Sequence, residues 1–182
     1  MANSKNIRNL VKQAKAGKVE AFGKVYDLLV RRVFRFTLWR VGNKEDAEDI
    51  TEEVFLKAWQ SLTSYEEKGP PFEAWLFKIC RNKVIDHYRT KKKQVSLDSL
   101  ASLADNSKSP EEIAYHKLQM SEVIKSLVKI KSSYQEIIIL KFIEDKENEE
   151  IGTILGKPKD HVRVLQGRAL KALKKAIEND QQ

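Results

Sequence analysis

Apolar residues recur at intervals of three and four along most of the chain, which is the period of an α-helix. Stripes of this kind predict helices over residues 6–16, 19–41, 44–62 and 72–93, and again from Pro110 to about Ile177. Gly42 stands where the second helix would end and Asn43 where the third would begin, because glycine favours helix C-termini and asparagine favours N-caps. No run alternates between apolar and polar residues as a strand would. The pattern therefore predicts an all-α protein.

Residues 94–110 (QVSLDSLASLADNSKSP) interrupt the helical pattern with five serines and no aromatic residue. A small, polar composition of this kind is typical of a linker between domains. We therefore expect two small helical domains, residues 1–93 and residues 113–182, joined by a flexible linker over residues 94–112.

The composition excludes several classes of protein. The longest uninterrupted apolar run, Ile137–Leu140, is far shorter than the roughly 20 residues of a membrane-spanning helix, so no membrane insertion is expected. The single cysteine, Cys80, excludes an internal disulfide and suits a reducing, cytoplasmic location.

The net charge of +8 is modest, but it is distributed in blocks. Residues 45–53 hold six acidic side chains and no basic one. Residues 78–93 and residues 157–175 each hold seven basic side chains and one acidic side chain. Because a chain that needs only solubility intersperses its charges, the blocks indicate several distinct binding surfaces.

The acidic block lies at the start of the predicted helix over residues 44–62. Asp46, Asp49 and Glu53 are spaced three and four residues apart, so they share a face opposite the apolar stripe. Acidic residues near a helix N-terminus are stabilised by the helix dipole, and charge alone favours that interpretation. The large rings of Phe55 and Trp59 flank the stripe and favour a second interpretation, in which the face docks a basic partner protein.

The first basic block lies on the predicted helix over residues 72–93. A helical wheel places one set of side chains in the core: Phe72, Trp75, Leu76, Ile79 and Cys80. It places another set on the opposite face, bordered by Phe77 and Tyr88: Lys78, Arg81, Asn82 and Arg89. Positive charge with interleaved aromatic rings suits unpaired nucleic acid, because phosphates are neutralised and bases stack. A solvated basic face is the alternative.

The second basic block lies in a helix-turn-helix pattern over residues 147–176, in which Gly156 and Pro158 separate the two helices. Pro158 is expected in the first turn of the second helix. That helix has an apolar side with Val162, Leu165, Ala169, Leu173 and Ala176. Its early exposed residues would reach base edges in a major groove: Asp160, Arg163, Val164 and Gly167. Lys171 and Lys174 would contact phosphates, although any helical hairpin can show this pattern.

Enzymatic chemistry has no support in the sequence. His87, His116 and His161 are far apart and lack partners at metal-ligand spacing. The seven glycines form no phosphate-binding loop. Cys80 falls on the apolar side of its helix, where a thiol is inert. We therefore expect a binding protein without catalytic residues, metal or cofactor.

Three segments together resemble one known family. DAEDITEEVFLKAW (residues 46–59) resembles the core-polymerase-binding helix of bacterial sigma factors of the extracytoplasmic-function (ECF) type, within the sigma-70 family. PFEAWLFKICRNKVIDHYRTKKK (residues 71–93) resembles their promoter-melting and minus-10-reading helices. Residues 127–173 resemble their fourth region, which reads the minus-35 element, although Gly152 stands where the family usually has alanine.

The resemblance implies a role for each surface. Residues implied in binding core RNA polymerase are Asp46, Asp49, Glu52, Glu53 and Phe55. Residues implied in minus-10 DNA binding are Tyr65, Lys78, Arg81, Asn82, Tyr88 and Arg89. Residues implied in minus-35 DNA binding are Lys159, Asp160, Arg163, Val164, Gly167, Lys171 and Lys174.

The resemblance thus implies an alternative sigma factor, which directs core RNA polymerase to specific promoters and initiates transcription. Its implied partners are core RNA polymerase and promoter DNA. An anti-sigma factor is a third candidate, because one often clamps the two domains of family members. Two other classes stay open from the residues alone: a helix-turn-helix regulator that is not part of polymerase, and a helical protein-interaction module.

Overall fold

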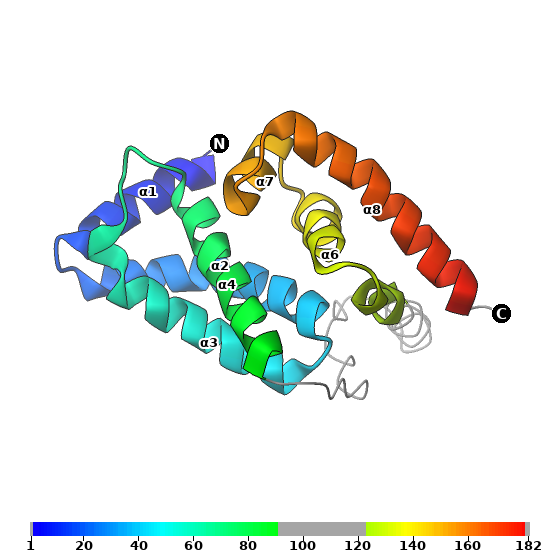
Figure 1. The fold of residues 1–182 in the computed structure, drawn as a ribbon. Coiled ribbons are helices and arrows are strands. Elements are labelled where there is room, and N and C mark those ends of the chain that lie inside the picture. The colour runs from blue at the N-terminus through cyan, green and yellow to red at the C-terminus, as the bar shows by residue number, and fades with distance from the viewer. Residues whose placement is uncertain (1, 91–122, 181–182) are drawn as a thin grey trace, which may run out of the picture.

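A computed structural model describes residues 2–90 and 123–180. Within these two ranges every regular element is helical, and the helices form an N-terminal group and a C-terminal group that lie against each other (Figure 1). The predicted all-α class is confirmed. The predicted linker, residues 94–112, lies outside the described ranges.

The N-terminal group has four helices and one short 3₁₀ turn. These are α1 (Ala2–Lys15), α2 (Val19–Val41), α3 (Lys44–Gln60), η1 (Leu62–Ser64) and α4 (Phe72–Thr90). Helix α2 packs against α1 and α3, and α4 packs against α3 and α2. Gly42 ends α2 in the left-handed conformation with φ of 69°, and the side chain of Asn43 accepts a hydrogen bond from the Asp46 amide at 2.8 Å. Both predicted helix boundaries are therefore confirmed.

The C-terminal group begins with helical residues 123–129. It continues with α6 (Ser132–Ile138), the π-helical turn η3 (Ile139–Ile143), α7 (Asn148–Leu155) and α8 (Lys159–Asp180). Helix α8 packs against α6 and α7, and Gly156 ends α7 with φ of 64°. The amide of Val162 donates to the carbonyl of Pro158 at 3.1 Å. Pro158 therefore caps α8 from the position before its first turn, one place earlier than predicted.

Gly152 lies in α7, where the turn after the helix folds back onto it. The amide of Lys157 donates to the carbonyl of Gly152 at 2.8 Å. A Cβ atom at Gly152 would lie 2.5 Å from the carbonyl oxygen of Lys157, which is closer than atoms can pack. The tight return of the chain therefore requires glycine here.

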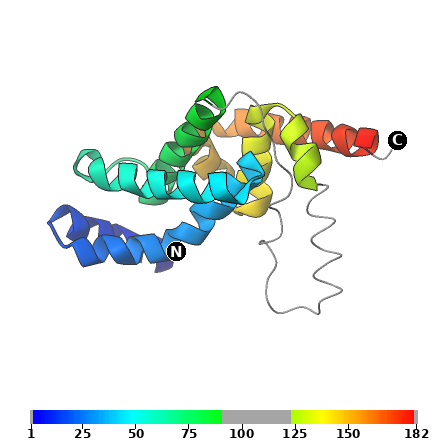
Figure 2. The same ribbon diagram turned by 90° about the horizontal axis from the view of Figure 1, so that it is seen from below.

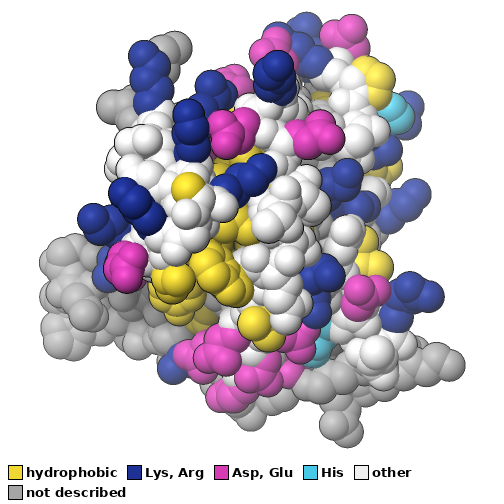
Figure 3. All heavy atoms as spheres, turned by 90° about the vertical axis from the view of Figure 1, so that its left-hand side faces the viewer, with side chains coloured by type: hydrophobic (Ala, Val, Ile, Leu, Met, Phe, Trp, Pro, Cys, Tyr) yellow, Lys and Arg dark blue, Asp and Glu magenta, His cyan; other side chains and the backbone are white. Residues whose placement is uncertain are grey.

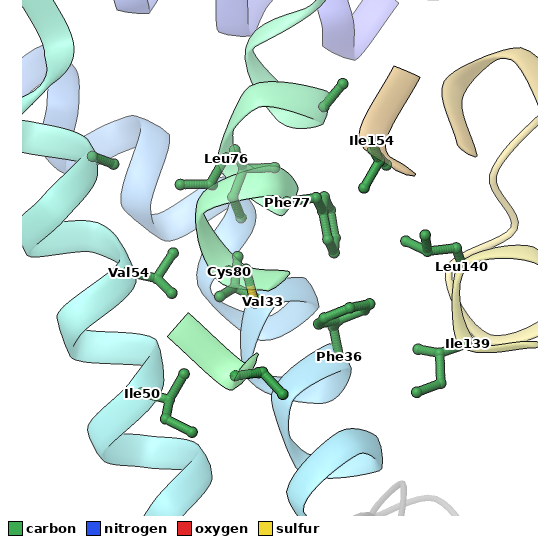
Figure 4. Packing of buried hydrophobic residues seen from close by; sticks show 14 of the residues in the cluster. Val33, Phe36, Ile50, Val54, Leu76, Phe77, Cys80, Ile139, Leu140 and Ile154 are labelled. Carbon is green, nitrogen blue, oxygen red and sulfur yellow. The ribbon is translucent and has the colours of Figure 1, made fainter. Parts of the chain in front are cut away.

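The two groups share one hydrophobic core. Phe36 and Phe77 lie edge to face with ring centroids 5.5 Å apart, and both point toward apolar side chains of the C-terminal group, namely Ile139, Leu140 and Ile154 (Figure 4). The packing of α4 on α7 and of α2 on η3 brings these residues together, as the view from below shows (Figure 2).

This shared core corrects the helical wheel drawn for α4. Phe77 was placed at the border of the basic face, but it is only 1% exposed because the C-terminal group covers it. Trp75 and Ile79, placed in the core, are partly buried and pack against it. Cys80 is fully buried as predicted, and burial raises the pKa of its thiol, which suits an inert role.

Candidate functional site

Helix α3 presents acidic side chains beside exposed hydrophobic ones. Asp49 and Glu52 are exposed. Large apolar side chains of α2 and α3 are exposed as well: Tyr26 (38%), Leu28 (37%), Leu56 (58%) and Trp59 (38%). Figure 3 shows acidic and hydrophobic side chains gathered next to each other on this side of the molecule. Exposed aromatic and apolar side chains beside charged ones are typical of a protein interface.

Two of the exposed rings on this surface each pack against a less exposed aromatic ring. Phe55 is only 4% exposed and packs edge-on against Tyr26, with ring centroids 4.7 Å apart. Phe22 packs against Trp59 with the two rings tilted relative to each other and their centroids 5.0 Å apart. Phe55, predicted as a direct polymerase contact, therefore lies beneath the surface and holds Tyr26 outward.

Two of the predicted acidic contacts face α4. Glu53 pairs with Lys83 at 2.7 Å, and Asp46 lies 3.5 Å from His87. Among the residues that the structure describes, no three His, Cys, Asp or Glu side chains are grouped so that they could hold a metal ion. Of the four predicted acidic contacts, Asp49 and Glu52 are therefore exposed, while Asp46 and Glu53 also tie α3 to α4.

The predicted minus-10 residues of α4 also divide into exposed residues and residues that contact other helices. Lys78, Asn82 and Arg89 are exposed. Tyr88 is 38% exposed, and its hydroxyl donates to the backbone carbonyl of Arg40. Arg81 is partly covered, and its Nε donates to Glu136 of the C-terminal group at 3.0 Å. Five of the six predicted minus-10 residues therefore lie on α4, and one of these five is engaged by the other group of helices.

Tyr65, the sixth predicted minus-10 residue, lies in a cluster of rings. It is 5% exposed, and its ring centroid lies 5.3 Å from those of Phe72 and of Trp75. Its hydroxyl donates to the carbonyl of Pro70 at 3.0 Å, and burial raises the pKa of the hydroxyl. Stacking of this ring on a base would require residues 65–71 to move.

All seven predicted minus-35 residues of α8 are exposed, while Val162, Leu165 and Ala169 pack against the rest of the C-terminal group. Gln166 donates to Asn148 of α7 at 2.7 Å and fixes the angle between the two helices. Lys159 pairs with Glu149 at 2.5 Å, which raises the pKa of the lysine and lowers that of the glutamate. The start of α8 is therefore the exposed part of a helix-turn-helix, the part that enters a major groove in proteins with this motif.

Two family models match this chain. Residues 25–94 match the family model "Sigma-70 region 2", and residues 127–175 match "Sigma-70, region 4". The ECF RNA polymerase sigma factor BldN of Streptomyces coelicolor is 30% identical over 181 residues, which is 98% of this chain and 69% of BldN. The chain belongs to the ECF sigma factors of the sigma-70 family.

Another ECF factor and two solved sigma factor structures are also similar to this chain. SigW of Bacillus subtilis is 29% identical over 182 residues, covering 94% of this chain and 96% of SigW. The solved structure of CnrH in complex with the cytosolic domain of CnrY has a TM-score of 0.76 at 24% identity, covering 96% of this chain and 99% of CnrH. RpoE of Bartonella quintana, solved with the anti-sigma factor NepR, has a TM-score of 0.68 at 23% identity, covering 86% of this chain and 96% of RpoE.

The ECF assignment decides between the classes that the sequence left open. The chain is an RNA polymerase sigma factor, a transcription initiation factor and not an enzyme, and its partners are core RNA polymerase and promoter DNA. A regulator separate from polymerase is not favoured, because the match to region 2 covers most of the N-terminal group. None of the described helices is long and apolar enough to cross a membrane.

Three residues of this sigma factor were not predicted from the sequence: Tyr26 and Leu56, which are exposed, and Arg40, which is fully buried. Tyr26 follows Val25 of the buried stripe directly, and two successive helical residues point about 100° apart, so Tyr26 lies off that stripe. Leu56 lies off the stripe of α3 and received no role. Arg40 lies in an apolar stretch, TLWRVG, where nothing nearby in the sequence signals its environment.

Proposed function

We propose that this sigma factor binds core RNA polymerase through α3, using Asp49 and Glu52 together with the exposed side chains of Tyr26, Leu56 and Trp59. Asp46, Glu53 and Phe55 belong to the same interface and set its shape. The observation that carries this proposal is the acidic and aromatic surface on α3, because carboxylates exposed beside large apolar rings match a basic, partly apolar partner.

Promoter contacts would be divided between the two groups of helices. Lys78, Arg81, Asn82, Tyr88 and Arg89 of α4 would hold the melted minus-10 strand, and Tyr65 would join them after its loop moves. The exposed residues of α8 would read the minus-35 element. The domain limits proposed for this division are 1–93 for region 2, 94–112 for the linker and 113–182 for region 4.

An anti-sigma factor is a further proposed partner. CnrH and RpoE, whose folds resemble this one, were solved in complex with CnrY and NepR. A factor that acts on polymerase would work in the cytoplasm, and the reduced, buried Cys80 is consistent with that location.

Run-off transcription with purified core RNA polymerase and a library of promoter fragments tests the proposed function. The chain should bind core polymerase, and transcripts should begin downstream of a shared pair of elements. Heat-denatured chain should give no transcripts above those of core polymerase alone. A folded chain that fails to bind core polymerase even at low salt would contradict the proposal.

A further inference from the structure

Arg40 is a fully buried arginine at the junction of the two groups of helices. It lies in α2 with 0% exposure, yet both of its side-chain partners belong to α6 of the C-terminal group. Its Nη1 donates to Glu136 at 2.9 Å, and its Nη2 donates to Ser132 at 2.9 Å. The cluster therefore exists only while the two groups lie together.

Glu136 accepts from a second arginine at the same atom. Its Oε1 receives the hydrogen bond from Arg40 and also one of 3.0 Å from Nε of Arg81 in α4. A single oxygen thus bridges two guanidinium groups, and the Nε of Arg40 is buried without a hydrogen-bond partner. The single negative charge of Glu136 therefore does not balance the two positive charges, and one N–H group of Arg40 has no acceptor. A phosphate group is the anion that paired guanidinium groups bind best, because it offers several oxygens to their fixed forks.

The cleft beside Arg40 points to the source of that phosphate. Its walls include Tyr88 and Arg89 of α4 on one side, and Val128, Ser132 and Gln135 of the C-terminal group on the other. Tyr88 and Arg89 are proposed minus-10 contacts, so Arg40 lies where the backbone of a strand held by α4 would pass. The C-terminal group occupies that place in this structure.

We propose that Arg40 and Arg81 together form a binding site for a backbone phosphate of the melted promoter strand, and that Glu136 fills this site as an internal substitute while the molecule is closed. The proposal rests on the proposed minus-10 role of α4 and adds Arg40 to it. It also gives Glu136 a function in the free factor, which is to keep DNA away from Arg40 and Arg81 until the C-terminal group moves.

The rest of the junction favours the closed state in the absence of partners. The side chain of Glu144 is fully buried and accepts from Nε of Arg32 at 3.0 Å and from Nε of Arg35 at 2.6 Å. Opening would break these ion pairs and would expose the rings of Phe36 and Phe77, which is unfavourable in water. Single-stranded DNA should therefore bind the free chain weakly, and weakening the Glu136 contact should reveal the site.

The test measures binding of the full chain to a fluorescein-labelled, mixed-sequence single strand of about 15 nucleotides, a length typical of such sites. Glu136→Gln keeps the shape of the side chain and removes its charge, so affinity should rise by about tenfold, as expected for loss of a charge-assisted contact. Glu20→Gln is the matched control, because it removes the same charge from an exposed position in the first turn of α2. Affinity should change far less in this control.

Arg40→Gln in the Glu136→Gln background tests the phosphate site itself. Arg40 and Glu136 are then both replaced by neutral side chains, and the charge that remains is that of Arg81, which is partly exposed to water. Affinity should return toward that of the unaltered chain, and the slope of log K against log salt should fall by about 0.7, the value for one lost phosphate contact on a single strand. Glu136→Asp is a second opening variant, because a shorter carboxylate cannot bridge both arginines, and it should also raise affinity.

Each failure has a distinct meaning. If Glu136→Gln and Glu136→Asp bind DNA no better than Glu20→Gln, Glu136 does not mask the site and the inference is overturned. If Arg40→Gln leaves the affinity of the opened variant unchanged while Arg81→Ala lowers it, Arg40 is no phosphate ligand and the inference alone fails. If neither substitution matters, the proposed minus-10 role of α4 fails as well.

Discussion

At Gly152 the steric limit set by the turn after α7 affects stability more than the low helix propensity of glycine does. Alanine is ordinarily better than glycine in a helix by about 1 kcal/mol. Here the added Cβ would meet the carbonyl oxygen of Lys157 at 2.5 Å, so Gly152→Ala should lower the free energy of unfolding by about 1–3 kcal/mol, as other overpacking substitutions do. Urea unfolding followed by circular dichroism measures the change.

Gly23→Ala is the control for that prediction. Gly23 lies inside α2 with no atom within 4 Å of an added Cβ, so alanine should raise the free energy of unfolding by about 0.5–1 kcal/mol. Equal stabilisation by both substitutions would show that the turn after α7 adapts to a methyl group.

Substitution of Asp49 distinguishes a role in polymerase binding from a role in capping α3. It is exposed in the second turn of α3, beyond the region where the helix dipole acts strongly. Asp49→Lys should weaken binding to core RNA polymerase by at least about tenfold, since charge reversal places like charges together at an interface. The melting temperature should hardly change.

Glu45→Lys gives the complementary result in the same helix. Glu45 is exposed in the first turn of α3, so reversal should lower stability by about 0.3–1 kcal/mol through the helix dipole. Binding to polymerase, measured by fluorescence anisotropy at fixed salt, should fall less than in Asp49→Lys. A loss of stability in Asp49→Lys without loss of binding would favour the capping interpretation of the acidic block.

At the scale of single elements, the helix boundaries were predictable because their signals are local. Gly42, Asn43 and Gly156 act on their own backbone, and each is found in the predicted role. The faces of α4 were less predictable, because burial of Phe77 depends on a group of helices that follows more than 30 residues later in the sequence. Arg40 was missed for the same reason, since its partner Glu136 lies 96 residues away.

The start of α7 carries a pH-dependent contact. Glu150 is partly buried, which acts to raise its pKa, but hydrogen bonds from Lys146 and from the backbone of Glu147 outweigh burial and hold the pKa below its usual value. A carboxyl group with a lowered pKa in the folded state stabilises the fold above the pKa of the unfolded chain, about 4.3, and loses this contribution as pH falls through the folded pKa.

Glu150→Gln should therefore lower stability at pH 7 and leave it unchanged near pH 3. The difference at pH 7 should be less than about 1 kcal/mol, because more than a third of the side chain is exposed and water screens the pair. Chemical unfolding of both chains at the two pH values measures it. A destabilisation of the same size at pH 3 would mean that shape, and not charge, is what Glu150 contributes.

On the scale of the whole molecule, the ion pairs of Glu144 predict how the free factor can be opened. This buried carboxylate is the shared partner of Arg32 and Arg35, which lie on α2 in the other group of helices. Glu144→Gln removes the carboxylate that Arg32 and Arg35 share across the junction, so that Arg32 keeps only Glu73 of α4 and Arg35 loses its ion pair with Glu144, and removing one partner of a buried pair is strongly unfavourable. The two groups should separate more often, and the radius of gyration from small-angle X-ray scattering should rise.

Glu149→Gln is the matched control for that measurement. Its carboxylate is 74% exposed and pairs with Lys159 inside the C-terminal group, so its loss should leave the radius of gyration unchanged. Both variants should keep their helical circular dichroism, which separates opening from unfolding. An unchanged radius in Glu144→Gln would mean that the apolar contacts around Phe36 and Phe77 hold the molecule closed without the ion pairs, and opening would then require a partner that covers those rings.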